Sequence, residues 1–451
     1  MRGAPQMPKV EGSGDPTGSP HAKLGIALSG GGSRAAAFHR GTIQGLEEND
    51  LLDQINVVSS VSGGSVFAAA WMAAGWKGRR LAQFLEDIGR ELAQGFVARS
   101  FTFNSIKLVL PSYTRANLLA ETFDLALTHG MKLKDLPERP SLCINTSVMN
   151  TGQVGKFSRY GFSSTGFHAP GEGQGQSNPT IPLAEYPVAL AATASAAFPV
   201  GLPPVFLLRG AHVPEGWGGP ALADHRRFAL TDGGVLENLG VQTLLKSKRF
   251  GTWDIIVSDA GRREEPWKPG GIVNSLRGAF TGAISLPILQ RVLTMMNSKE
   301  NRHMRLTAYG EIERTWLIEA VRGSGTQVGL DDYLVSQPSA TRRRVLFIRL
   351  NQTLDELLAA IPRWRLRELA ARANQTLPDR LPPVQELLRS YEVNLAPALE
   401  IHAAMGGDAR IGQLNRIGTH FTALPTRDIE ALYAHARWQV HATRALYWDK
   451  R

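Results

Sequence analysis

The sequence has one cysteine, Cys143, among its 451 residues. A single cysteine excludes an intramolecular disulfide, and it excludes a metal site built from several cysteines. A reducing compartment is the natural setting for such a chain, so we expect a cytoplasmic protein.

Long apolar runs are also missing. No window approaches the roughly 18 consecutive apolar residues of a membrane-spanning helix, and the N-terminus lacks the apolar core of a secretory signal. Residues 1–22 are instead rich in glycine, proline and serine, which predicts a disordered tail. Any contact with a membrane is therefore expected to be peripheral.

Acidic residues are outnumbered, with 40 Asp and Glu against 50 Lys and Arg, giving a formal net charge of +10. This charge suits an anionic membrane surface or a nucleic acid, although a basic solvated surface explains it equally well. The longest basic run, Arg342–Arg344, is too short for a nucleic-acid-binding arm, and no nucleic-acid-binding motif accompanies it. We therefore expect no nucleic-acid partner.

The order of the predicted elements favours an α/β fold. A strand at 23–28, a helix at 35–48, a strand at 55–58 and a helix at 66–74 follow one another, which predicts a parallel sheet with helices on its faces. Further strands are predicted at 141–149, 153–159, 227–231, 254–258 and 345–350, with helices at 183–197 and 272–296 and mostly helix over 353–392 and 395–445.

Ser62 lies between a buried strand and an Ala-rich helix, and two glycines follow it. Strand, sharp turn with serine and helix is the arrangement of a nucleophile elbow, whose usual pattern is G-x-S-x-G. Here Ser60 replaces the first glycine, while Gly63 and Gly64 follow the central serine. By itself the fragment favours a plainer interpretation, in which Ser62 is the N-cap of the helix.

Three glycines, Gly30, Gly31 and Gly32, lie between the first strand and the first helix, followed closely by Arg34. Successive backbone N–H groups in such a loop can bind an anion, and in acyl transfer they would form an oxyanion hole. Arg34 would steady the loop or attract an anionic substrate. A dinucleotide-binding loop is the rival interpretation, but it requires an acidic residue at the end of the second strand, where Ser59–Ser60 stands.

Asp232 follows another strand and precedes Gly233 and Gly234. Asp-Gly is common in ordinary turns. However, the carboxyl ends of parallel strands meet at one edge of a sheet, so we expect the glycine loop, Ser62 and Asp232 to lie together there.

No histidine stands in a glycine-marked loop after a clear strand; His39, His225, His303, His402 and His420 all lie elsewhere. We therefore favour a Ser–Asp dyad, in which Asp232 takes the Ser62 proton and later activates water. A free carboxylate is too weak a base, so partial burial must raise the pKa of Asp232. A Ser-His-Asp triad with a hidden histidine stays open.

These motifs together resemble the patatin-like phospholipase family. The resemblance rests on Gly30–Arg34, Ser60–Gly64 and Asp232–Gly234 in that order, with Ala194–Pro199 and Pro203–Val205 before the aspartate. It implies a three-layer fold with a mostly parallel central sheet and a metal-independent hydrolase that cleaves lipid esters. Ser62 and Asp232 would be catalytic, with oxyanion donors from the glycine loop and Gly63, and Asn238 would support the site.

The resemblance covers residues 23–260 well. We accordingly expect a catalytic domain over 23–350 and a helical C-terminal region over 351–451 that packs on it. No cofactor or metal is expected, and the expected partner is a lipid or phospholipid substrate. A non-catalytic or activator-dependent lipid-binding module on the same fold is the alternative, and the oligomeric state is not readable.

Overall fold

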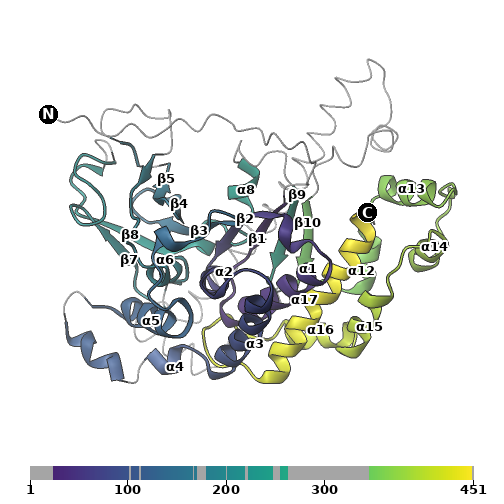
Figure 1. The fold of residues 1–451 in the computed structure, drawn as a ribbon, viewed down its shortest axis with the longest axis horizontal. Coiled ribbons are helices and arrows are strands. Elements are labelled where there is room, and N and C mark those ends of the chain that lie inside the picture. Colours follow the sequence, from purple (N-terminus) through teal and green to yellow (C-terminus); the bar gives the residue numbers. More distant parts are fainter. Residues whose placement is uncertain are drawn as a thin grey trace, which may run out of the picture.

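The computed structural model describes residues 24–100, 103–110, 113–165, 167–169, 179–199, 201–218, 222–246, 254–262 and 345–448. Ten strands of these residues form one sheet with helices packed on it (Figure 1). The main path through the sheet runs β10-β9-β1-β2-β3-β4-β5-β6, while β8 pairs with β3 and β7. The predicted N-terminal tail and the helix predicted at 272–296 lie outside the described residues.

The centre of the sheet is parallel, as predicted. It consists of β10 (Val345–Arg349), β9 (Asp254–Asp259), β1 (Leu24–Leu28), β2 (Ile55–Val61) and β3 (Ser141–Val148). Every residue of β1 and β9 is buried, as expected of parallel strands that are covered on both faces.

The other strands extend the sheet in antiparallel order. They are β4 (Gln153–Ser158), β5 (Gly161–Ser164), β6 (Thr180–Ile181), β7 (Val205–Leu208) and β8 (Arg227–Asp232). The antiparallel course of β8 differs from the sequence-based argument, which placed Asp232 at the end of a parallel strand. Along β3, the pairing with β2 ends at Asn145 and the pairing with β8 ends at Thr146, opposite Asp232. The carboxyl ends of β2 and β8 therefore meet end to end.

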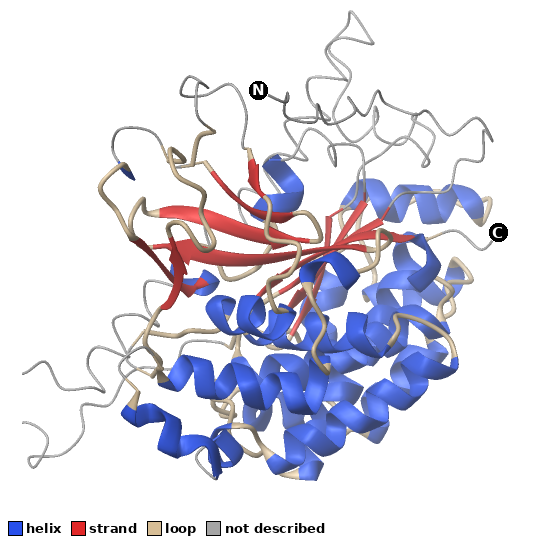
Figure 2. Ribbon diagram, turned by 60° about the vertical axis from the view of Figure 1, so that its left-hand side comes forward, coloured by secondary structure: helices blue, strands red, loops and turns tan. Residues whose placement is uncertain are grey.

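Helices cover the sheet, most of them on one side (Figure 2). The first half of the chain contributes α1 (Gly32–Glu48), α2 (Gly63–Ala74), α3 (Arg79–Gln94), α4 (Val97–Ser100), α5 (Arg115–Phe123), α6 (Val188–Ser195) and α8 (Gln242–Lys246). Alternate strand residues enter two different cores. Ile26 and Val58 belong to the large core shared with α1, α2, α3, α5 and α6, and Ala27 and Val57 belong to a smaller core with Leu244 of α8.

The C-terminal region is helical but more broken than predicted. It contains α12 (Leu354–Ala359), α13 (Arg363–Arg372), α14 (Val384–Ser390), α15 (Ala396–Ala404), α16 (Ile411–Leu414) and α17 (Thr426–Tyr447). Prolines 362, 383 and 425 are N-caps of new helices, because a proline lacks the N–H that would continue a preceding one. Pro187 likewise starts α6 later than the predicted residue 183.

The long helix α17 packs closely along α1. A Cβ on Gly41 would lie 2.0 Å from the Tyr433 carbonyl oxygen, and one on Gly45 would lie 2.7 Å from the Val440 Cβ. The two helices therefore approach each other at positions where only glycine fits.

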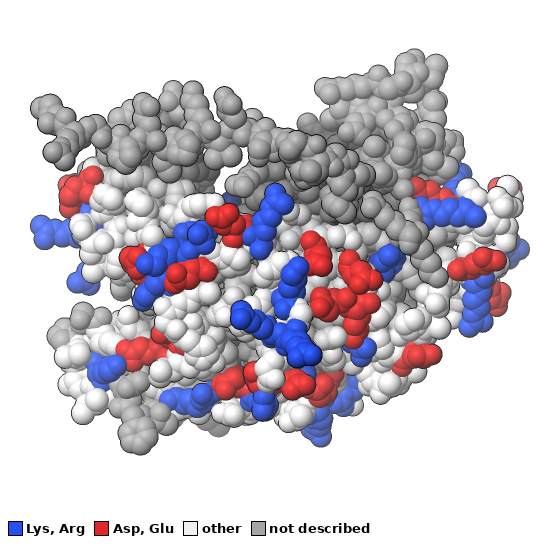
Figure 3. Space-filling model, viewed as in Figure 1, with Lys and Arg blue, Asp and Glu red and all other residues white. Residues whose placement is uncertain are grey.

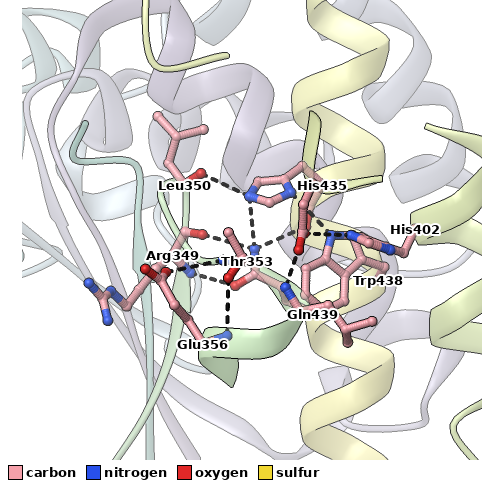
Figure 4. Close-up of polar contacts among 10 residues, drawn as sticks. Arg349, Leu350, Thr353, Glu356, His402, His435, Trp438 and Gln439 are labelled. Carbon is pink, nitrogen blue, oxygen red and sulfur yellow. Dashed lines mark hydrogen bonds and ion pairs between the residues drawn. The ribbon is translucent and has the colours of Figure 1, made fainter. Parts of the chain in front are cut away.

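Helix α17 is also joined to strand β10 by buried polar groups (Figure 4). The Gln439 side chain accepts from Arg349 N at 2.8 Å and donates to Arg349 O at 2.9 Å. His435 Nε2 donates to Leu350 O at 2.8 Å, while its Nδ1 accepts from Trp438 Nε1 at 3.1 Å. Burial lowers the pKa of His435 to about 4, which is consistent with a neutral ring. Within the described residues, no helix combines the length and the apolarity needed to cross a membrane.

Candidate active site

Ser62 occupies the sharp turn between β2 and α2. Its backbone has φ 50° and ψ −121°, and its side chain makes no capping hydrogen bond to the helix. The N-cap interpretation favoured by the isolated fragment is therefore wrong for the side chain. A positive φ is uncommon for a residue other than glycine, and here it turns the Oγ away from the helix that follows.

Glycines let the neighbouring backbone pass close to this turn. A Cβ on Gly63 would lie 2.4 Å from the Gly32 carbonyl oxygen, and a Cβ on Gly64 would lie 2.4 Å from the Leu28 carbonyl oxygen. Both distances are far below a van der Waals contact, so no other residue fits at either position without a backbone shift. These contacts pack the turn directly against the glycine loop.

Ser60, which stands in place of the usual first glycine, fits without disrupting the turn. It is buried, and its Oγ donates to the Cys143 carbonyl oxygen at 3.3 Å. It also accepts a hydrogen bond from Ser65 Oγ at 3.0 Å. A hydroxyl with both a donor and an acceptor partner is tolerated in a buried position.

Ser195, at the end of α6, is a site residue that the sequence analysis did not single out. Its Oγ accepts from Ser62 N at 2.9 Å and donates to the Asn145 carbonyl oxygen. Helix α6 and strand β3, both distant in sequence, thereby hold the backbone N–H of Ser62 in place through the Ser195 hydroxyl. The only signal for it in the sequence is its place in the segment 194–199.

Asp232 faces Ser62 across the junction of β2 and β8. Ser62 Oγ donates to Asp232 Oδ2 at 2.7 Å, and Asp232 Oδ1 accepts from Gly234 N at 2.7 Å. The two side chains belong to residues that are only 7% and 4% exposed. Burial raises the pKa of Asp232 to about 6, and the hydrogen bonds from Ser62 and Gly234 oppose this shift. A carboxylate with a raised pKa is a stronger base than an exposed carboxylate with an ordinary pKa.

The three glycines of the loop have different environments. Gly30 N donates to the Asn238 carbonyl oxygen at 2.9 Å, so this N–H is already used. Nothing in the described part of the chain accepts from the N–H of Gly31 or Gly32, which open helix α1 with positive φ values of 142° and 59°. The N–H of Gly63, at the start of α2, has no partner there either. Unpaired N–H groups at helix starts are suited to hold a negative oxygen.

Asn238 and Glu237 support the loop from the turn after β8. A Cβ on Gly30 would lie 2.1 Å from Asn238 Oδ1, so the asparagine side chain packs against the loop. Glu237 is buried, and its carboxylate accepts from the N–H groups of Leu239 and Gly240 at 2.6 and 2.9 Å. Burial raises the pKa of Glu237 to about 7. No motif along the chain marks Glu237, because its partners are backbone groups.

Arg34 is buried, and its side chain points to backbone oxygens of other segments. Its Nε donates to Ala260 O at 3.2 Å and its Nη1 donates to Ile417 O at 2.8 Å. Burial lowers the pKa of Arg34 to about 9. These contacts favour the steadying role over attraction of an anionic substrate.

The segment 417–422 of the C-terminal region contacts the same loop. Ser33 N donates to His420 O at 3.3 Å, and Ser33 Oγ donates to Thr422 O at 3.2 Å. A Cβ on Gly32 would lie 2.1 Å from the Thr419 carbonyl oxygen. The glycine loop is therefore enclosed between the elbow and a segment almost 400 residues away in sequence.

We expect replacement of Arg34 by methionine to lower the free energy of unfolding by about 2 kcal/mol or more, because the buried Ala260 carbonyl and the partly buried Ile417 carbonyl lose their donor. Chemical denaturation of the full chain measures this. Lys77→Met is the matched control, since it removes an exposed ion pair with Asp53 and should cost less than about 1 kcal/mol. Equal losses in the two variants would contradict the steadying role.

The histidines do not complete a triad within the described residues. No histidine there hydrogen-bonds to Ser62 or Asp232, and His303 lies outside them. His39 is buried beneath the loop, where its ring nitrogens lie 2.7 Å from Ser258 Oγ and 2.8 Å from Ser29 O. Burial lowers the pKa of His39 to about 4, so it is a neutral structural group.

No group of three or more His, Cys, Asp or Glu side chains in the described ranges could hold a metal ion. The arrangement instead joins a serine hydroxyl, a buried carboxylate and unpaired N–H groups. This set can support nucleophilic attack on a carbonyl carbon.

Several solved structures resemble the chain. Human GIVD cytosolic phospholipase A2 is 13% identical with a TM-score of 0.46, and the match covers 94% of this chain and 61% of that one. VipD from Legionella pneumophila is 12% identical with a TM-score of 0.30, covering 88% and 79%. ExoU with SpcU from Pseudomonas aeruginosa is 16% identical with a TM-score of 0.25, covering 91% and 87%. With TM-scores below 0.5, these likenesses say nothing about the substrate of this chain.

No curated protein matches the sequence. The model of one protein family does, over residues 26–245, and its description is patatin-like phospholipase. The matched range contains the glycine loop, the elbow and Asp232, the features on which the resemblance in the sequence rests. Residues 26–245 therefore form a domain of the patatin-like phospholipase family.

Proposed function

We propose that this protein is a serine acyl hydrolase that cleaves ester bonds of phospholipids or related lipids. Ser62 is the nucleophile, Asp232 is the base, and the N–H groups of Gly31, Gly32 and Gly63 bind the oxyanion. The observation that carries the proposal is the 2.7 Å hydrogen bond from Ser62 Oγ to Asp232 Oδ2 in a buried site. The family of the domain supports the choice of a lipid ester as substrate.

In the first half of the reaction, Ser62 Oγ attacks the ester carbonyl carbon while its proton passes to Asp232 Oδ2. The carbonyl oxygen becomes negative and is held by the backbone N–H groups, which are fixed in place before the reaction. The positive ends of helices α1 and α2 favour the same charge. The protonated Asp232 then gives its proton to the leaving alcohol, and an acyl-Ser62 ester remains.

In the second half, Asp232 takes a proton from a water molecule that attacks the acyl-Ser62 carbonyl. The same N–H groups hold the second oxyanion. Its collapse releases the fatty acid, and Ser62 Oγ recovers its proton from Asp232. One carboxyl group thus acts alternately as base and acid, and neither half of the reaction requires a histidine or a metal.

The proposal is tested by the pH dependence of hydrolysis of a short-chain p-nitrophenyl ester and of a labelled phospholipid by the full chain. We expect turnover of both, because both present an ester carbonyl. Asp232 must be ionised to accept a proton, and its pKa is raised to about 6. Below pH 6, kcat/KM should therefore fall about tenfold per pH unit, and it should level off above about pH 7.

A profile that stays flat down to pH 4, or an inflection above pH 8, would contradict Asp232 as the base. Absence of turnover of either ester at every pH would contradict the proposed activity itself. A control reaction without enzyme corrects for the spontaneous hydrolysis of the p-nitrophenyl ester at high pH.

The proposal includes a division of the chain into a catalytic domain over 23–350 and a helical region over 351–451 that packs on it. The fit of α17 against Gly41 and Gly45 supports this packing, as do the contacts of segment 417–422 with the glycine loop. A cytoplasmic location with peripheral contact to an anionic membrane belongs to the same proposal.

A further inference from the structure

A short segment between α4 and α5 has its apolar side chains turned outward. Of the exposed large hydrophobic residues in the described part of the chain, three lie within five positions: Ile106, Val109 and Leu110 are 75%, 79% and 56% exposed. They lie in or next to the 3₁₀ helix η2 (Phe103–Val109). In a 3₁₀ helix residues three apart share a side, so Ile106 and Val109 project together.

The charged residue of the segment is bound to the neighbouring helix α5. Lys107 Nζ donates to both carboxylate oxygens of Glu121 on α5, at 3.0 and 2.8 Å, and lies 5.7 Å from the Tyr113 ring centroid. Lys107 and Leu108 are half-buried. The ion pair joins the 3₁₀ helix to α5, and the aliphatic residues of the segment point outward. This is the reverse of the usual arrangement in a globular protein, and an exposed apolar cluster of this kind marks an interaction site.

The local charge selects the kind of partner. From residue 92 to residue 120 the sequence contains no Asp or Glu, but it contains Arg99, Lys107 and Arg115. Two of these pair with Glu91 and Glu121 at the two ends of the stretch, whereas Arg115 is exposed and has no ion pair among the described residues. Arg115 thus leaves a local excess of positive charge, and aliphatic tips beside such an excess suit an anionic lipid surface.

The overall excess of positive charge does not by itself define such a surface. On the face drawn in Figure 3, basic and acidic side chains are interspersed, without a single basic patch. In Figure 1 the described part of the chain between α4 and α5 lies at the lower-left edge of the molecule.

The segment is also connected to the proposed active site. Phe96 and Val97, at the start of α4, both donate from their backbone N–H to Phe421 O, at 2.9 and 3.1 Å. The Phe96 and Phe421 rings both pack against Phe123, with centroid distances of 5.2 and 5.3 Å. The neighbouring His420 carbonyl accepts from Ser33 of the glycine loop. Helix α4, next to η2 along the chain, is therefore connected to that loop through residues 420 and 421.

We propose that Ile106, Val109 and Leu110 form a membrane-docking surface that inserts into an anionic lipid bilayer. The inference rests on the proposed function for the identity of its partner, since a lipid hydrolase must meet its substrate at such a surface. It goes beyond that function in assigning the contact to one segment of the chain.

The test is co-sedimentation of the full chain with vesicles of equal parts phosphatidylcholine and phosphatidylglycerol, using Ser62→Ala to prevent lipid turnover. Adding Ile106→Asp and Val109→Asp should weaken binding at least about tenfold, because two aliphatic insertions are lost and two negative charges are added. Met149→Asp is the matched control, since Met149 is 58% exposed in the turn after β3, and it should bind as the parent does. Thermal unfolding checks that each variant is folded.

Unchanged vesicle binding after Ile106→Asp and Val109→Asp, or no binding by the parent, would overturn the surface. A dimer in lipid-free buffer that these substitutions dissociate would also overturn it, in favour of a contact between two copies of the chain.

The catalytic proposal is tested separately in the Ser62-containing protein. Ile106→Asp with Val109→Asp should leave hydrolysis of a soluble short-chain ester unchanged and reduce hydrolysis of vesicle lipid at least about tenfold. Vesicle binding that depends on Ile106 without any ester turnover would reject the hydrolase and keep the docking surface. Loss of soluble-ester turnover in this variant would count against a surface that acts only in docking.

Discussion

Replacing Ser62 by alanine is expected to lower kcat/KM for ester hydrolysis by at least about 1,000-fold. The Oγ that donates to Asp232 Oδ2 is the atom proposed to attack the carbonyl, and no other hydroxyl in the described residues donates to that carboxylate. The fold should survive, because Ser62 makes no side-chain capping bond and alanine removes only one buried hydroxyl. Turnover of the p-nitrophenyl ester and of the labelled phospholipid measures the loss.

Ser65→Ala is the matched control for this variant. Ser65 is also buried and lies one helical turn further along α2, where its Oγ bonds to Ser60 Oγ and Ser195 Oγ instead of Asp232. We expect its turnover to stay within about tenfold of the wild type. Turnover that survives in Ser62→Ala, or that disappears equally in both variants, would refute Ser62 as the nucleophile.

Replacing Asp232 by asparagine is expected to lower kcat/KM by about 100- to 10,000-fold, since an amide keeps the shape of the side chain but cannot accept the Ser62 proton as a base. Substrate binding should change little, so the loss should appear in kcat. The remaining activity should also lose the inflection near pH 6, which belongs to the Asp232 carboxyl group. Steady-state kinetics across the pH range measures all three effects.

The stability of Asp232→Asn gives a second, independent readout. Because burial raises the folded-state pKa of Asp232 to about 6 from 3.8, the carboxyl group weakens the fold as pH rises through that interval. A neutral amide removes this dependence, so at pH 7 the variant should be no less stable than the wild type. A large loss of stability would mean that the drop in activity reflects unfolding.

Histidine variants distinguish the dyad from a triad. His225→Ala, His303→Ala and His402→Ala should each keep turnover within a few-fold of the wild type if Asp232 is the base. A loss in one of them that matches the loss in Asp232→Asn would instead identify a catalytic histidine.

The sequence by itself determined the parallel centre of the fold and the parts of the candidate site that are marked by glycine. Buried β-branched runs alternate with helical patterns, and such an alternation has few solutions other than a parallel sheet with helices on its faces. Glycine is visible in the sequence because specific close approaches require it. Gly63 and Gly64, for example, leave no room for a Cβ beside the backbone of residues 28–32.

The sequence did not determine how Asp232 reaches Ser62. The expectation that Asp232 lies near Ser62 was correct in outcome, but its reason was wrong, because β8 is antiparallel to β3. The meeting of the two residues depends on the pairing register of three strands, and register is set by packing across the whole sheet.

Only the tertiary structure decided the environment of the site. Ser195 orients the Ser62 backbone, Glu237 holds the turn beside Asn238, and segment 417–422 encloses the glycine loop. The contacts of Ser195 and of segment 417–422 join groups that are far apart in the sequence, and those of Glu237 are made to backbone N–H groups, which every residue other than proline has. No pattern along the chain therefore reveals them. The raised pKa of Asp232 has the same origin, since desolvation depends on every element that surrounds the carboxyl group.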